Sequence, residues 1–190
     1  MKTIAVDLDD TLNDFTETIR TTRFEHNESF ALSPDTFDEY LERVRYNPTD
    51  SGDLLSTEYT FFRAKIHLEG IRRAKARPDG VDFMRWLRQE GWRIVICTGR
   101  DLRRSYCYTK TWLDENGIPF DQMFWAGNKV VFCKLWGIGI LVDDDLFNIQ
   151  YGPQYGVSVY YPINDKNRTV APGGALGFES FDEVKSWIRK

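Results

Sequence analysis

The sequence predicts an α/β fold in which a parallel sheet is covered by helices on both faces. Short apolar, β-branched runs recur along the chain, and segments with helical patterns separate them. The runs are almost continuously apolar, as is typical of strands that are buried on both sides. With 190 residues, 42% of them hydrophobic, the chain is long enough for one core and a small inserted module.

The first predicted strand covers residues 2–8, and the segment after it is helical in pattern. No convincing strand follows before residue 93. We therefore expect a helical insertion over residues 14–76, directly after the first strand. The core domain would then consist of residues 1–13 and 77–190.

The second half of the chain alternates between strand and helix patterns. Further strands are predicted at residues 93–98, 122–125, 138–143 and 157–161, and helices at residues 81–88, 101–115 and 129–136. A capping box at residues 180–183 predicts one more helix. Residues 164–177 have the composition of turns, and we expect a loop or connector there.

Composition limits the classes of partner. A net charge of −4 argues against extended nucleic-acid binding, which is typical of proteins with a basic face. The three cysteines have no metal-binding spacing and read as reduced thiols. No apolar run suits a signal peptide or a membrane span. We expect a cytoplasmic monomer or homodimer with no membrane partner.

Carboxylates gather where the predicted strands end. Asp7 and Asp9 follow the first strand, Thr98 ends the second, and Asp143 and Asp144 end a later one. Ligands of open α/β sheets bind beyond these ends, and acids that meet there repel one another unless a cation is present. Carboxylate oxygens suit Mg²⁺. The sequence predicts a Mg²⁺ site formed by Asp7, Asp9, Asp143 and Asp144.

The two acids after the first strand predict phosphoryl transfer. Asp7 is placed to attack phosphorus, which would give an aspartyl-phosphate. Asp9 points to the same side of an extended chain, so it can protonate the leaving oxygen and later deprotonate the attacking water.

Phosphate binding is expected from the end of the second strand. The Thr98 hydroxyl and the Gly99 N–H can donate to phosphoryl oxygens. Arg100 either binds phosphate or is a surface arginine in the first turn of a helix. A lysine is also needed to offset the negative charge, and Lys129 is the first choice, with Lys134 as the alternative because it lies closer to the later acidic pair.

Taken in order, these residues resemble the haloacid dehalogenase superfamily of phosphohydrolases. VDLDDTL resembles its first motif, with Asp7 as nucleophile, Asp9 as acid/base and Thr11 as a supporting threonine. ICTGR resembles the second motif, Lys129 fits the third, and VDDD resembles the fourth. The resemblance covers most of residues 1–161 and implies a Rossmann-like core. It also implies that the second acid of the fourth motif touches the metal, while the first holds the lysine or a metal-bound water.

The position of the insertion is similar to the C1 cap of that superfamily, and the chain resembles its 5'(3')-deoxyribonucleotidase branch. This resemblance implies a small phosphorylated substrate, a (deoxy)nucleoside monophosphate, with cap aromatics such as Phe15 against the base. Aromatics at this spacing are also common in a helical core. Residues 97–121 resemble phosphatase domains of polynucleotide kinase type as well. A sugar phosphate or a nucleic-acid 3'-phosphate end is therefore the alternative substrate.

A receiver-like phospho-acceptor signalling module is the alternative from another class. Such modules also combine an acidic pair, an acceptor aspartate, a Thr or Ser and a Lys around Mg²⁺. Their acceptor lies on a later strand than the acidic pair, and no acid lies two residues beyond it. Asp9 and the insertion therefore favour an enzyme. Of the neighbouring acids, Asp10 is expected to face solvent or cap a backbone N–H, and Asp145 to cap the following helix.

Overall fold

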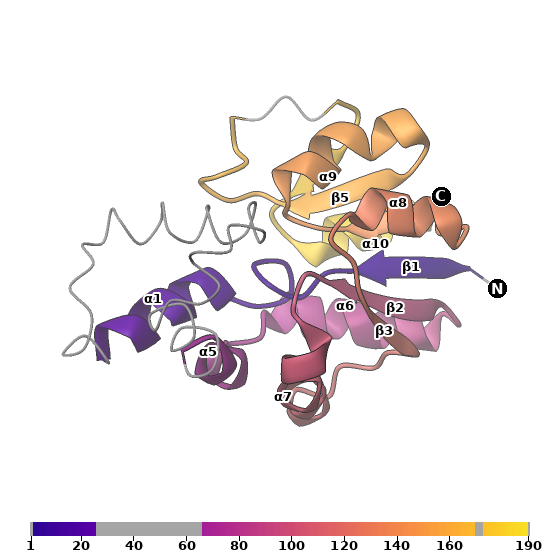
Figure 1. Ribbon diagram of the computed structural model, residues 1–190. Coiled ribbons are helices and arrows are strands. Elements are labelled where there is room, and N and C mark those ends of the chain that lie inside the picture. Colours follow the sequence, from indigo (N-terminus) through magenta and orange to yellow (C-terminus); the bar gives the residue numbers. More distant parts are fainter. Residues whose placement is uncertain (1, 26–65, 170–172, 190) are drawn as a thin grey trace.

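A computed structural model describes residues 2–25, 66–169 and 173–189 of the chain. It contains a six-stranded, fully parallel sheet in the order β3-β2-β1-β4-β5-β6 (Figure 1). The strands are β1 (Thr3–Val6), β2 (Arg93–Thr98), β3 (Gln122–Trp125), β4 (Ile140–Val142), β5 (Ser158–Pro162) and β6 (Leu176–Phe178). The predicted α/β class is confirmed.

Helices cover both faces of the sheet, because successive residues of the buried strands point to opposite sides. Ile4 and Val6 belong to one core cluster together with residues of α6 (Pro78–Gln89), α7 (Leu102–Glu115) and α10 (Phe181–Ile188). Ala5, between them, belongs to a second cluster with residues of α8 (Lys129–Leu135) and α9 (Leu146–Tyr151). A short 3₁₀ helix, Pro153–Tyr155, precedes β5.

Local signals explain how these helices begin. Asp145 accepts a hydrogen bond from the N–H of Phe147, so it caps α9 as predicted. Ser180 and Glu183 form the predicted capping box of α10. Helix α6 begins at Pro78, three residues before the predicted start at Val81, because proline is well suited to the first helical position.

The sixth strand corrects the prediction of a loop or connector over residues 164–177. Leu176–Phe178 pairs in parallel with β5 at the edge of the sheet, and Phe178 is fully buried. Three residues are too few to show a strand periodicity in the sequence. Gly173 and Gly174 precede the strand with φ values of 54° and 106°, a conformation that glycine adopts readily.

The chain leaves the core after β1 and returns at an adjacent point. The N–H of Asp14 donates to the Lys75 carbonyl (3.2 Å), and the N–H of Arg77 donates to the Leu12 carbonyl (2.8 Å). Between these points, α1 (Phe15–Glu25) and α5 (His67–Arg73) pack against each other. These contacts lie next to the predicted boundaries at residues 14 and 76. The division into core and helical insertion stays a prediction, since residues 26–65 lie outside the described part.

No helix within the described ranges has the length and apolar character needed to cross a membrane. Cys97, Cys107 and Cys133 are free thiols, as expected from their spacing.

Candidate active site

Three neighbouring strands, β2, β1 and β4, bring the predicted site residues together at the carboxyl ends of the strands. β1 lies between β2 and β4, and the N–H of Asp7 extends the ladder by donating to the Val142 carbonyl (2.9 Å). Thr98 ends β2 and Asp143 directly follows β4. These carboxyl ends face the side of the molecule where α1 and α5 lie (Figure 1).

Lys129 links two of the acids across this edge. Its Nζ lies 2.8 Å from Asp7 Oδ2 and 2.7 Å from Asp143 Oδ2. Lys129 is the first residue of α8, and Asn128 fixes this start by accepting from the N–H of Val131 (2.9 Å). Lys134, the alternative lysine, is exposed further along the same helix. The structure therefore places Lys129, and not Lys134, between the acids.

Burial sets the electrostatics of this trio, in which all three side chains are less than 8% exposed. Burial raises the pKa of the Asp7 carboxyl to about 7, although the charge of Lys129 opposes the rise. Burial acts to lower the pKa of Lys129, but the charges of Asp143 and Asp7 outweigh it, so this pKa lies above its usual range. Lys129 therefore stays charged at neutral pH.

A cation site is indicated by Asp7, Asp143 and Asp144, whose carboxylate oxygens lie within 4.8 Å of one another. Asp7 Oδ1 is buried and accepts no hydrogen bond from any described residue. Asp144 Oδ1 accepts from the Thr11 hydroxyl (3.4 Å). A buried carboxylate oxygen without a donor is costly unless a cation lies near it. The donor set therefore fits a hard divalent ion.

Asp143 differs from Asp144 because protein donors occupy both of its oxygens. Its Oδ1 accepts from the N–H of Asp145 (2.9 Å), and its Oδ2 accepts from Asn148 Nδ2 (3.2 Å) in addition to Lys129. Asp143 is thus arranged to hold the lysine. Asp7 Oδ1 and Asp144 are the better candidates for direct metal ligands.

Asp9 lies outside this cluster, although the sequence analysis included it among the metal ligands. Its carboxylate oxygens face the Arg100 guanidinium, with Nε 3.1 Å from Oδ1 and 2.9 Å from Oδ2. Burial acts to raise the pKa of Asp9, but the charge and hydrogen bonds of Arg100 outweigh it and hold this pKa below its usual value. The Asp9 side chain is accordingly anionic when nothing else is bound.

The predicted phosphate-binding residues occupy different environments. Thr98 is fully buried, and its hydroxyl accepts from the N–H of Arg100 (3.1 Å). Gly99 is exposed, and a Cβ placed on it would meet no atom within 4 Å. Phe15 is only 9% exposed and packs edge-on against His67, with ring centroids 5.3 Å apart. Its ring is therefore largely covered by protein.

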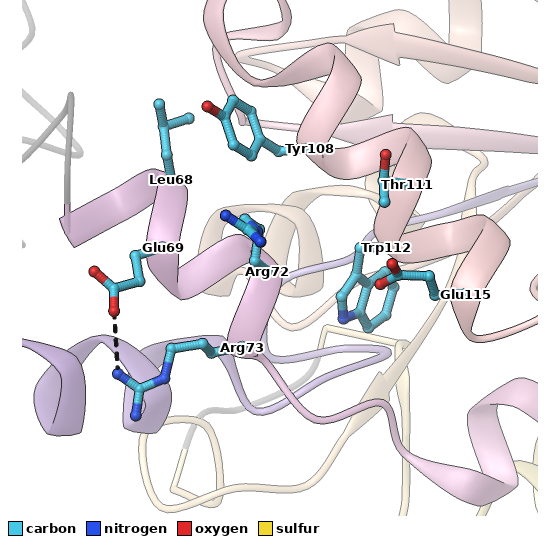
Figure 2. A pocket seen from close by; sticks show the side chains of 8 residues that line it. All are labelled: Leu68, Glu69, Arg72, Arg73, Tyr108, Thr111, Trp112 and Glu115. Carbon is cyan, nitrogen blue, oxygen red and sulfur yellow. Dashed lines mark hydrogen bonds and ion pairs between the residues drawn. The ribbon is translucent and has the colours of Figure 1, made fainter.

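A separate cavity of about 520 Å³ lies between α5 and α7. Figure 2 shows Leu68 and Tyr108 on its two sides, Arg72 between the helices, and the ion pair of Glu69 with Arg73 (3.4 Å). Its lining includes none of the carboxylates at the sheet edge. This cavity is therefore separate from the carboxylate cluster.

Comparison with known proteins defines the fold. No family model and no curated protein matches the sequence. A haloacid dehalogenase-like family hydrolase from Streptococcus pneumoniae matches with a TM-score of 0.70 at 16% identity, over 99% of this chain and 98% of that chain. The HAD-hydrolase YfnB from Bacillus subtilis, bound to magnesium, matches with a TM-score of 0.69 at 13% identity, over 100% and 99% of the two chains. D,D-heptose 1,7-bisphosphate phosphatase from B. bronchiseptica, complexed with magnesium and phosphate, matches with a TM-score of 0.57 at 14% identity, over 100% and 98%.

The chain has the haloacid dehalogenase-like fold. Within this fold, Asp7, Asp143 and Asp144 lie together after β1 and β4, and all three are among the residues predicted from the sequence. The sequence did not predict two polar partners of the site residues. Asn148 donates a hydrogen bond to Asp143, and Thr109 accepts one from Arg100. Each is a buried polar residue on the inner face of a helix, at 4% and 0% exposure. A polar residue at an apolar position of a helical pattern is the signal that would have identified them.

Proposed function

We propose that this protein is a Mg²⁺-dependent phosphomonoesterase that works through an aspartyl-phosphate at Asp7. The observation that carries the proposal is the buried Asp7 carboxylate, which has one oxygen on Lys129 and the other without a donor among the described residues. A carboxylate that is fixed but incompletely satisfied suits a nucleophile. A bound Mg²⁺ would supply positive charge that screens the two anions, phosphate and Asp7, from each other.

The first step forms the covalent intermediate. Asp9, anionic in the free protein, takes up a proton from solvent when the phosphate ester binds, because the negative charge of the phosphate opposes the effect of Arg100. An Asp7 oxygen then attacks phosphorus, the bond between phosphorus and the leaving oxygen breaks, and Asp9 gives its proton to that oxygen. Lys129 stays charged throughout and offsets the negative charge of Asp7 and of the transferred group. The Gly99 N–H is the proposed donor to the phosphoryl oxygens, because Gly99 is exposed directly after the end of β2.

The second step returns the enzyme to its starting state. Asp9, now a carboxylate, takes a proton from the attacking water, whose oxygen bonds to phosphorus as the bond to Asp7 breaks. Inorganic phosphate leaves, and Asp9 is protonated again for the next cycle. A phosphate ester and one water are converted to an alcohol and phosphate.

Metal binding should be visible as thermal stabilisation. Mg²⁺ at about 100 times its dissociation constant should raise the unfolding midpoint by about 5–10 °C. The rise should be larger at pH 8 than at pH 6, because protons compete for Asp7, whose pKa is about 7. Differential scanning fluorimetry with and without Mg²⁺ measures this shift.

The matched variants separate the site from general effects of salt. Asp144→Asn should remove the Mg²⁺-dependent rise. Asp82→Asn, an acid that is 68% exposed on α6, should keep it. An equal rise in both variants would show that Mg²⁺ does not bind at the carboxylate cluster.

The substrate that we propose is a (deoxy)nucleoside monophosphate, on the resemblance of the motifs and of the insertion to nucleotidases. A sugar phosphate is the second candidate, and two observations favour it. A similar solved structure is a phosphatase of D,D-heptose 1,7-bisphosphate, and Phe15, which the resemblance assigned to the base, is nearly covered.

A substrate panel decides between them. We expect Mg²⁺-dependent release of phosphate from p-nitrophenyl phosphate, and kcat/KM for nucleoside monophosphates at least about tenfold above that for sugar phosphates. A preference for sugar phosphates would refute the nucleotide assignment and leave the phosphatase intact. No release from any member of the panel would refute the phosphatase itself.

A further inference from the structure

The proposed acid/base Asp9 forms an ion pair with a buried arginine, Arg100. Arg100 contacts the Asp9 carboxylate through Nε, 3.1 Å from Oδ1 and 2.9 Å from Oδ2, and through Nη2, 2.5 Å from Oδ1. The Arg100 side chain is 0% exposed, whereas that of Asp9 is 24% exposed. The carboxylate therefore reaches the solvent side of the pair, and the guanidinium does not.

Arg100 is itself held on its remaining sides. Its Nη1 donates to the Thr109 hydroxyl on α7 (3.1 Å), and the centre of its guanidinium lies 5.3 Å from the centroid of the Phe15 ring at the start of α1. A cation over an aromatic face is attracted to it, and a planar guanidinium held at both ends loses little further freedom. A phosphate in the active site cannot contact a side chain with no exposed surface.

We propose that Arg100 is a positioning residue for Asp9 and does not bind phosphate. This inference rests on the proposed phosphatase function. Arg100 fixes the plane of the carboxylate, so that one oxygen is presented to the leaving group when the bond to phosphorus breaks and the proton moves to the leaving oxygen. Phe15 and Thr109 act through Arg100 by fixing the guanidinium.

The hydrogen bonds also indicate which oxygen carries the proton. Oδ1 accepts from both Nε and Nη2, whereas Oδ2 accepts from Nε alone. The oxygen with fewer donors retains a lone pair in the carboxylate plane. Oδ2 is therefore the atom that delivers the proton and later receives one from water. A lysine in place of Arg100 offers a point charge and cannot fix this plane.

The leaving group provides a readout that a merely structural residue would not change. Protonation matters most when the leaving oxygen is strongly basic, so phenyl phosphate depends on Asp9 more than p-nitrophenyl phosphate does. In Arg100→Lys and Arg100→Gln we expect the rate constant of the first step, measured as single-turnover release of the phenol, to fall at least about tenfold further for phenyl phosphate than for p-nitrophenyl phosphate. KM for both substrates, and inhibition by inorganic phosphate, should change less than about threefold.

A double variant tests whether Arg100 acts through Asp9. In the Asp9→Asn background, Arg100→Lys should cause little additional loss, because the carboxylate that it positions is absent. Arg103→Gln serves as the control, because the neighbouring Arg103 side chain is 93% exposed. This variant should hydrolyse both substrates at the wild-type rates. Circular dichroism checks that each variant is folded, and Thr109→Val is the milder change that replaces Arg100→Gln if that variant unfolds.

The possible results are distinct. Equal losses on both substrates together with a large rise in KM would show that Arg100 binds phosphate, and the proposal would be wrong. Full additivity of Arg100→Lys and Asp9→Asn would also refute it. A wild-type protein inactive on both esters would instead refute the proposed function, on which the positioning role depends.

Discussion

Replacing Asp7 by asparagine is expected to abolish turnover, lowering phosphate release from p-nitrophenyl phosphate by at least about 10³-fold. Asparagine keeps the shape of the side chain that faces Lys129, so the fold should be retained. The amide lacks the anionic oxygen that attacks phosphorus, and it is a poorer metal ligand. Initial rates at saturating Mg²⁺ measure the effect.

Two further measurements make this test specific to a covalent intermediate. After acid quenching with labelled substrate, the wild type should carry a labelled phosphoryl group, and Asp7→Asn should carry none. Asp82→Asn, exposed on α6, is the control and should behave as the wild type does. Label on another residue, or undiminished turnover in Asp7→Asn, would exclude the proposed nucleophile.

The arrangement of the carboxylates could be predicted because strand ends can be recognised in the sequence. Asp7 and Asp143 each follow a short apolar run, and parallel strands bring such positions to the same edge. Their separation by more than a hundred residues does not matter once β1 and β4 are neighbours. The same reasoning favoured Lys129. It begins the helix after β3, so it lies near the carboxyl ends of the parallel strands.

The pairing of Asp9 with Arg100 could not be predicted in the same way. Strand register fixes backbones, whereas the direction of a long side chain depends on the packing around it. The sequence left Arg100 open between phosphate binding and the surface, and the structure buries it instead, under Phe15 and against Thr109. Phe15 lies on a helix far from Arg100 in the sequence, so no local pattern could show that contact.

Removing Lys129 is expected to reduce both catalysis and stability. Lys129→Met keeps much of the side-chain length but leaves Asp7 and Asp143 buried without their shared cation. Loss of one partner from a buried ion pair costs about 3–5 kcal/mol of unfolding free energy. Phosphate release should fall at least about 10²-fold, because nothing offsets the charge that gathers on the nucleophile and the phosphoryl group.

The stability loss should depend on pH. Burial raises the pKa of Asp7 to about 7, and Lys129 holds it down, so removal of Lys129 raises it further. A folded-state pKa above the unfolded value of 3.8 makes ionisation unfavourable for the folded protein as pH rises through this window. The deficit relative to the wild type should therefore be larger at pH 8 than at pH 5, as measured by urea unfolding at both values.

Lys134→Met is the matched control, since Lys134 is exposed on the same helix. Its unfolding free energy should stay within about 0.5 kcal/mol of the wild type at both pH values. Mg²⁺ should restore part of the stability of Lys129→Met, because a cation at Asp7 and Asp144 again neutralises buried charge. A deficit that is independent of both pH and Mg²⁺ would mean that Lys129 contributes packing alone, and its assignment as the lysine of the phosphoryl-transfer site would have to be abandoned.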